Sequence, residues 1–399
     1  MIKLFERKEE CCGCTACKSI CPAGSINMVA DEEGFLYPGI DSSLCIECGL
    51  CKKVCAFQNG YNTADNFNEP IVYAMKHKSD EVRFNSSSGG AFTAISDYVL
   101  SDSGVVYGAA FGDGFQIIHQ RAETKEERNT LRGSKYVQSD LKQVFLEINK
   151  DLNSERNVLF SGTPCQVAGL KKYLEEIKTD KRKLMLNDLL CHGVSSPLLW
   201  SKYLDFIQKK NKLISYTFRA KEIGWRGYNI KADYENGMRK INTLDIEIYS
   251  NLFGTDLILR PSCYHCKFCN SQRPSDIMIG DFWGIEKFLP KFDDNKGISL
   301  VFVNTPKGKA IFQMIKHDIN FAVSNIKDCM QKNLTQPTAM PENREQFWTN
   351  YQINGFEYIA QKYSGYSFQG RIKKIIIVLL KKYGLFMIVK KVVRKIPKK

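Results

Sequence analysis

The chain has 399 residues, of which 43% are hydrophobic, enough for a globular protein of about two or three domains. Its net charge of +14 is concentrated between residues 371 and 399, where eleven Lys or Arg and no acidic residue leave +3 for the other 370. The nearly neutral remainder and the lack of a base-reading motif argue against a nucleic-acid binder. No phosphate-binding GxxxxGK[ST] loop and no Ser, His and Asp arrangement point to an ATPase or a hydrolase.

Two runs of cysteines with one spacing open the chain. Each run reads C-x2-C-x2-C-x3-C, from Cys11 to Cys21 and from Cys45 to Cys55. This pattern is typical of two-cluster bacterial ferredoxins, in which three thiolates bind one [4Fe–4S] cube and the fourth Cys binds the other cube. Cys12 is left without a role. The spacing assigns one cluster to Cys11, Cys14, Cys17 and Cys55, and a second to Cys45, Cys48, Cys51 and Cys21.

Two other uses of these cysteines fit less well. Structural zinc needs two separated pairs of ligands around one tetrahedral ion, not three closely spaced thiolates and a fourth, twice over. A disulfide framework needs an oxidising compartment, whereas the chain opens MIKLFERKEE without an apolar signal segment. We therefore expect a ferredoxin-type domain over residues 1–60 and a cytoplasmic protein.

A polar linker over 61–70 precedes a second unit in which strand and helix patterns alternate. This alternation predicts an α/β fold, α+β for the chain as a whole. The sequence predicts strands at 71–75, 104–111, 115–122, 157–160, 184–190, 276–280 and 298–304, helices at 91–100, 165–176 and 197–208, and small-residue turns at 86–90 and 161–164.

The turn SGTPCQ predicts a helix start, because Thr163 and Gln166 have capping-box spacing with Pro164 at the first helical position. Free backbone amides at that start, approached across Gly162, would suit the phosphates of a nucleotide cofactor. The SSSGG turn offers a second such place. Cys165 lies in the first helical turn, where the helix dipole favours a thiolate. It is a cluster ligand, a redox participant or a small buried residue.

A third cysteine triplet, Cys263, Cys266 and Cys269, has the same two-residue intervals. It predicts a third cube, for which Cys191 is the preferred fourth ligand ahead of Cys165, with His192 as the next donor. The alternative for this triplet is zinc, with His265 or Cys191 as fourth ligand.

Six segments in order, SSSGGAFTAISDYVL, RGSKYVQSD, FSGTPCQVAGL, LLCHGVSSP, GWRGY and RPSCYHCKFCNSQRPSDIMIGDFWG, resemble the coenzyme F-420 hydrogenase/dehydrogenase beta-subunit family. The resemblance implies an amino-terminal, flavin-binding part over 70–145 and a carboxy-terminal part with the third triplet over 146–340. It also implies FAD, iron–sulfur clusters and electron exchange with the deazaflavin F-420, although no GxGxxG fingerprint is present.

The resemblance places ten residues around the flavin: Ser88, Gly89, Gly90, Gly133, Ser134, Lys135, Tyr136, Gly162, Thr163 and Pro164. It assigns the family's own cluster to Cys191, Cys263, Cys266 and Cys269. Arg226 in GWRGY and Asp281 in GDFWG are candidates to face the substrate, and with Cys165 they are the weak candidates for catalysis. A solvated Arg226 and a buried structural Asp281 are the alternatives.

Together these features predict an iron–sulfur flavoprotein oxidoreductase that couples one-electron transfer to two-electron FAD chemistry. An external ferredoxin is the expected donor. The acceptor would be deazaflavin or a small organic molecule such as a sugar or sugar nucleotide, in surface polysaccharide metabolism. The alternatives are a non-catalytic electron-transfer subunit docked to a partner enzyme, and a redox sensor with structural clusters.

The tail over 371–399 has the composition of a basic amphipathic helix. Its longest apolar run has six residues, far fewer than the ~20 that span a bilayer. Peripheral contact with anionic lipid on the inner face of the membrane and packing on the protein body are both consistent with it.

Overall fold

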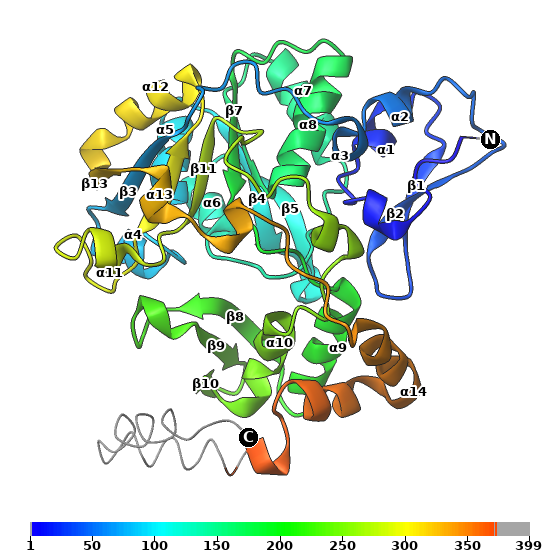
Figure 1. Ribbon diagram of the computed structural model, residues 1–399, viewed down its shortest axis with the longest axis vertical. Coiled ribbons are helices and arrows are strands. Elements are labelled where there is room, and N and C mark those ends of the chain that lie inside the picture. The colour runs from blue at the N-terminus through cyan, green and yellow to red at the C-terminus, as the bar shows by residue number, and fades with distance from the viewer. Residues whose placement is uncertain (1, 371, 373–399) are drawn as a thin grey trace.

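The computed structural model describes residues 2–370 and 372 (Figure 1). The predicted basic tail thus lies, except for residue 372, outside the described residues. In the part that is described, no helix combines the length and the apolar character that crossing a membrane requires.

An eight-stranded mixed sheet forms the centre of the molecule (Figure 1). Its strand order is β13-β3-β12-β11-β7-β6-β4-β5. The four strands β11, β7, β6 and β4 run parallel, and the outer pairs are antiparallel. The strands are β3 (Ile71–His77), β4 (Val105–Phe111), β5 (Ile117–Ala122), β6 (Val158–Gly162), β7 (Leu184–Leu189), β11 (Ile277–Asp281), β12 (Ser299–Val303) and β13 (Ile319–Ser324).

Helices cover both faces of this sheet because alternate strand residues point to opposite sides. In β4, Val105 and Tyr107 pack with α7 (Val144–Asn153) and α8 (Pro164–Glu176) on one face. Val106 packs with α5 (Ala91–Ser101) and α12 (Pro306–Met314) on the other. Short helices lie in the connections: α4 (Asp80–Phe84), α6 (Lys125–Leu131), α11 (Ile285–Phe288) and α13 (Ile326–Cys329). The predicted α/β fold is confirmed.

A second, smaller layer lies beside the large sheet (Figure 1). It has an antiparallel three-stranded sheet of β8 (Leu213–Ala220), β9 (Asn229–Tyr234) and β10 (Arg239–Ile241), packed with helices α9 (Pro197–Ile207), α10 (Leu244–Gly254) and α14 (Arg344–Tyr363). Its core is aromatic, with Trp200, Tyr203 and Tyr249 in mutual ring contact. The sequence patterns did not predict this sheet.

The cysteine-rich segment packs against α8 on the side of the large sheet (Figure 1). It contains a hairpin of β1 (Ile26–Ala30) and β2 (Leu36–Ile40) and the short helices α1 (Ala16–Ile20), α2 (Leu50–Lys53) and α3 (Ala56–Asn59). Its buried Ile20, Val54 and Phe57 belong to the same apolar cluster as Phe145 and Leu170 of the body. The segment and the body therefore share one core. Strands from both sides of residue 145 likewise share the large sheet, and the domain boundaries given above stay a prediction.

Candidate functional site

A cavity of about 890 Å³ is lined by residues of both sheets. Three of its lining residues end parallel strands or sit beside their ends: Gly162 on β6, Leu189 on β7 and Asp281 on β11. Open α/β sheets bind ligands at the carboxyl ends of their strands, so this is the expected position for a site. The volume lies in the range of small-molecule and cofactor sites.

Two small-residue turns meet at one wall of the cavity. The backbone N–H of Ser134 donates to Ser87 Oγ at 2.7 Å, and the hydroxyl oxygens of Ser134 and Ser87 are 3.0 Å apart. The SSSGG turn is held from behind, since Ser88 Oγ donates to the carbonyl of Ile298 and Lys221 Nζ donates to the carbonyl of Ser88. The structure thus brings together the turns at 86–90 and 133–136, which are far apart in sequence.

Most of the predicted flavin residues line this cavity, namely Ser88, Gly90, Gly133, Ser134, Lys135, Tyr136, Gly162 and Thr163. Gly89 and Pro164 are not among its lining residues. Gly89 lies behind the turn, where a Cβ would stand 2.3 Å from the carbonyl oxygen of Met75. Pro164 begins α8, as the capping box predicts, and the Thr163 backbone N–H donates to Gln166 Oε1 at 3.0 Å.

Three cavity-lining residues carry a buried polar atom that has no hydrogen-bond partner in the described structure: Thr93 Oγ1, His119 Nδ1 and Arg219 Nη2. Burial lowers the pKa of His119 to about 4, so the ring is neutral, with Nε2 at 3.2 Å from the carbonyl oxygen of Ser161. Buried polar atoms are normally satisfied. These three atoms therefore offer hydrogen bonds to a polar ligand.

Arg219 and Asp281 join the two layers at the cavity wall. Arg219 Nη1 lies 2.9 Å from Asp281 Oδ2, and the guanidinium stands over the rings of Tyr228 and Trp283. Asp281 thus lies at the site. Arg226 does not line the cavity and pairs instead with surface carboxylates.

Sequence reasoning missed His119, Arg219, Tyr228 and Trp283 as lining residues. The neighbours of His119 along the chain indicate only a structural role. Arg219 lies on β8, in the sheet that no pattern predicted. The adjacent GWRGY and GDFWG motifs are the available signals for Tyr228 and Trp283, but a motif names a segment and not the direction of a side chain.

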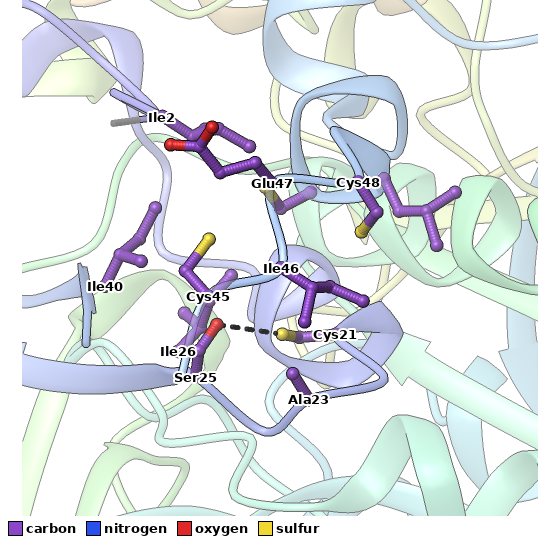
Figure 2. A pocket seen from close by; sticks show the side chains of 12 residues that line it. Ile2, Cys21, Ala23, Ser25, Ile26, Ile40, Cys45, Ile46, Glu47 and Cys48 are labelled. Atoms are coloured by element: carbon purple, nitrogen blue, oxygen red, sulfur yellow. Dashed lines mark hydrogen bonds between the residues drawn. The ribbon is translucent and has the colours of Figure 1, made fainter. Parts of the chain in front are cut away.

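The second predicted group of cysteines surrounds one hollow near the surface. Cys21, Cys45, Cys48 and Cys51 all line it, and Figure 2 shows the first three around the space beside Ile46. Cys21 comes from the first run, so the crossover predicted from spacing is present in the fold. The Cys21 sulfur lies 3.2 Å from Ser25 Oγ.

The first predicted group is more deeply buried. Burial raises the pKa of the Cys17 thiol, and the nearby Cys14, Cys11 and Cys55 add to the rise. Burial also raises the pKa of Cys55 to about 11, again with Cys14 and Cys11 contributing. These mutual effects place the four sulfurs in one neighbourhood.

The third predicted group lies between the first group and the cavity. Burial raises the pKa of the Cys191 thiol, and nearby Cys263, Cys165 and Cys266 raise it further. The thiol of Cys269 is hydrogen-bonded to Cys266, which lowers the Cys269 pKa. Cys191 also lines the cavity. All four predicted ligands are therefore near one another, with Cys165 beside them.

Cys12, which the ferredoxin spacing leaves over, connects the first and third groups. Its thiol contacts Cys14 on one side and Cys165 on the other, and both contacts and burial raise its pKa. The contact with Cys12 lowers the pKa of Cys165 to about 7. Within residues 2–370 and 372, no three His, Cys, Asp or Glu side chains converge on the position of one metal ion. A cube needs wider spacing, because each thiolate binds a different iron atom.

A buried ion pair fixes the third group. Asp188, at the end of β7 before Cys191, and Arg273, just beyond the triplet, are almost fully buried and 2.9 Å apart. Arg273 also donates to the carbonyls of Phe268 and Leu189. The pair therefore ties the Cys191 strand to the loop that carries the triplet.

We expect Asp188→Ala to lower the free energy of unfolding by about 3–5 kcal/mol, because it leaves the Arg273 charge buried without its carboxylate. Denaturant titration of the purified protein measures this. The matched control is Glu357→Ala, which breaks an exposed pair with Lys209 and should cost less than about 1 kcal/mol. Equal losses in both variants would contradict the structural role of the buried pair.

The carboxy-terminal part of the chain matches a known family. Residues 155–328 match the C terminus of the family described as "Coenzyme F420 hydrogenase/dehydrogenase, beta subunit". No curated protein matches the chain. A solved structure of the F420-reducing [NiFe] hydrogenase complex from Methanosarcina barkeri contains a chain that is 16% identical, with 75% of this chain and 94% of that chain covered and a TM-score of 0.46. Residues 155–328 place this redox protein in the coenzyme F-420 hydrogenase/dehydrogenase beta-subunit family, as the sequence motifs predicted.

Proposed function

We propose that the protein is an iron–sulfur flavoprotein oxidoreductase with three [4Fe–4S] clusters and one FAD. The observation that carries this proposal is the serial arrangement of the three cysteine groups, from a surface hollow to the wall of a cofactor-sized cavity. Clusters exchange single electrons and a flavin exchanges two, so together they interconvert the two kinds of redox chemistry.

The series can be followed residue by residue. It begins at Cys48, which is exposed. The two ferredoxin-type groups are connected through the chain itself, because Cys51 and Cys55 follow one another along α2 and its C-terminal turn. From the first group, Cys14 contacts Cys12, and Cys12 contacts Cys165. Cys191 of the third group then reaches the cavity.

The cavity fits FAD on three grounds. Its volume is sufficient, its small-residue turns allow close backbone approach, and Thr93, His119 and Arg219 present unsatisfied polar atoms. The residues proposed to contact the flavin are the lining members of the predicted set. The acceptor would enter the same cavity, where Arg219 and Asp281 provide polar contacts beside Trp283. Deazaflavin or a small organic acceptor, including a sugar nucleotide of polysaccharide metabolism, would suit this environment.

An external electron carrier is the proposed partner. Leu44 and Ile46, beside the second group, are 53% and 65% exposed, and Ile46 lines the hollow. Exposed apolar residues next to a redox centre are suited to transient docking. The same feature favours the second candidate function, an electron-transfer subunit of a larger complex. The fifteen cysteines are all free thiols, which suits a reducing compartment such as the cytoplasm.

The decisive experiment is iron, labile sulfide and flavin analysis of the anaerobically purified or reconstituted chain. We expect about twelve iron atoms, because each of three cubes holds four, and one FAD per chain. About eight iron atoms would remove the third cluster, and colourless protein without iron or flavin would refute the proposal. Reduction of a small acceptor by the isolated chain with a chemical reductant would favour the enzyme over the docked subunit.

A further inference from the structure

Arg260 is a fully buried arginine at the contact between the cysteine-rich segment and the body. It directly precedes the 3-10 turn Pro261–His265, which carries Cys263. Its backbone N–H donates to the carbonyl of Val194, and its own carbonyl accepts from the Cys263 N–H at 2.8 Å. The main chain of Arg260 therefore helps to position the third cysteine group.

The side chain of Arg260 points into the other segment. Its Nε donates to the Cys11 carbonyl at 2.9 Å, and Nη2 donates to the Leu36 carbonyl at 3.0 Å and lies 3.8 Å from the Cys11 sulfur. Nη1 donates to Gln138 Oε1 at 2.8 Å, and the guanidinium is 4.2 Å from the centre of the Tyr37 ring. One side chain thus contacts the first cysteine group while its backbone supports the third.

The charge of Arg260 lacks a carboxylate partner. In the described part of the chain, the ion pairs do not include Arg260, in contrast to the buried Arg273 with Asp188. A buried charge without compensation is strongly unfavourable. The anionic groups that approach this guanidinium are cysteine sulfurs, with Cys11 in direct contact and Cys12 and Cys263 near enough to act on it. A cube held by four thiolates carries net negative charge and would supply the missing compensation.

We propose that Arg260 is a positioning residue that docks the cysteine-rich segment on the body and raises the reduction potential of the cluster on Cys11, Cys14, Cys17 and Cys55. This inference rests on the proposed function, because it requires the clusters. A fixed positive charge stabilises the reduced cluster, which carries one more electron than the oxidised cluster. The residue would thereby favour electron occupancy at the group next to Cys12 and Cys165.

The chain offers a matched control in Arg344, a second buried arginine between the same two parts. It pairs with Glu33 of the cysteine-rich segment and donates to the hydroxyl of Tyr264 and the carbonyl of Leu259. No cysteine is among its partners in the described structure. Arg344 therefore contributes to docking without contacting a thiolate.

The test is an anaerobic redox titration of the full chain, followed by electron paramagnetic resonance, on wild type, Arg260→Gln, Arg260→Lys and Arg344→Gln. The signal of the first cluster is identified by its absence from a Cys17→Ser variant. We expect Arg260→Gln to lower the equilibrium constant for reducing this cluster by about tenfold or more, which is 59 mV for one electron. Arg260→Lys should shift it less, and Arg344→Gln should leave it unchanged.

Three outcomes would overturn the inference: an unchanged potential in Arg260→Gln, an equal shift in Arg344→Gln, or loss of the cluster from both Arg260 variants in folded protein. Loss from Arg260→Gln alone, with the cluster retained in Arg260→Lys, would support the need for the charge. Wild-type protein without any cluster would instead refute the proposed function, so the two failures are distinguishable.

Discussion

Replacing Cys266 by Ser is expected to reduce the iron content of anaerobically prepared protein by one third, from about twelve to about eight atoms per chain. Cys266 is the middle thiol of the third triplet, and it acts electrostatically on both Cys269 and Cys191. A serine hydroxyl keeps the size of the side chain but is a poor ligand for iron in a cube. The third cluster should be lost and the first two retained.

The same variant should slow reduction of the flavin by an electron carrier, because the third group is the one that reaches the cavity through Cys191. Metal analysis and stopped-flow absorbance measure the two effects separately. The control is Cys329→Ser. Cys329 is buried in a different apolar cluster, where its thiol donates to the carbonyl of Ile326, so its replacement should leave iron content unchanged. Full iron content in Cys266→Ser would contradict a third cluster on this triplet.

The strands and helices of the large sheet could be predicted because their signals are local. The apolar run at 184–190 and the turn SGTPCQ each determine an element from a few adjacent residues, and β7 and α8 lie close to the predicted bounds. Cysteine spacing is equally local, which explains how Cys21 could be assigned to the hollow lined by Cys45.

The features that were not predictable depend on packing between distant segments. The small sheet has strands of three to eight residues, whose patterns resemble those of loops. His119 belongs to the site only because β5 brings it close to Ser161 of β6. Cys12 and Cys165 are 153 positions apart, and only the docking of α1 on α8 brings them together. Nothing in the residues next to Arg260 indicates that its side chain reaches Cys11.

The docking of the cysteine-rich segment also depends on Gly169 of α8. A Cβ at this position would stand 2.7 Å from the Cys14 sulfur and 2.9 Å from the Cys14 Cβ. Neither atom belongs to the flexible end of a long side chain, so the contact cannot be relieved by a rotamer change alone. Glycine is therefore required here by close approach of a helix to a cluster ligand, although it lowers the intrinsic stability of the helix.

We expect Gly169→Ala to destabilise the protein by about 1–3 kcal/mol through overpacking and to reduce occupancy of the first cluster. Thermal unfolding and iron analysis of anaerobic samples measure both effects. The comparison variant is Gly39→Ala in the same segment, where the nearest atom to a new Cβ is a Val29 methyl at 3.4 Å, an ordinary contact. Unaltered stability and iron in Gly169→Ala would mean that α8 and Cys14 are not in close contact. The contacts that place Cys12 between Cys14 and Cys165 would then have to be abandoned too, because they depend on the same packing of α1 on α8.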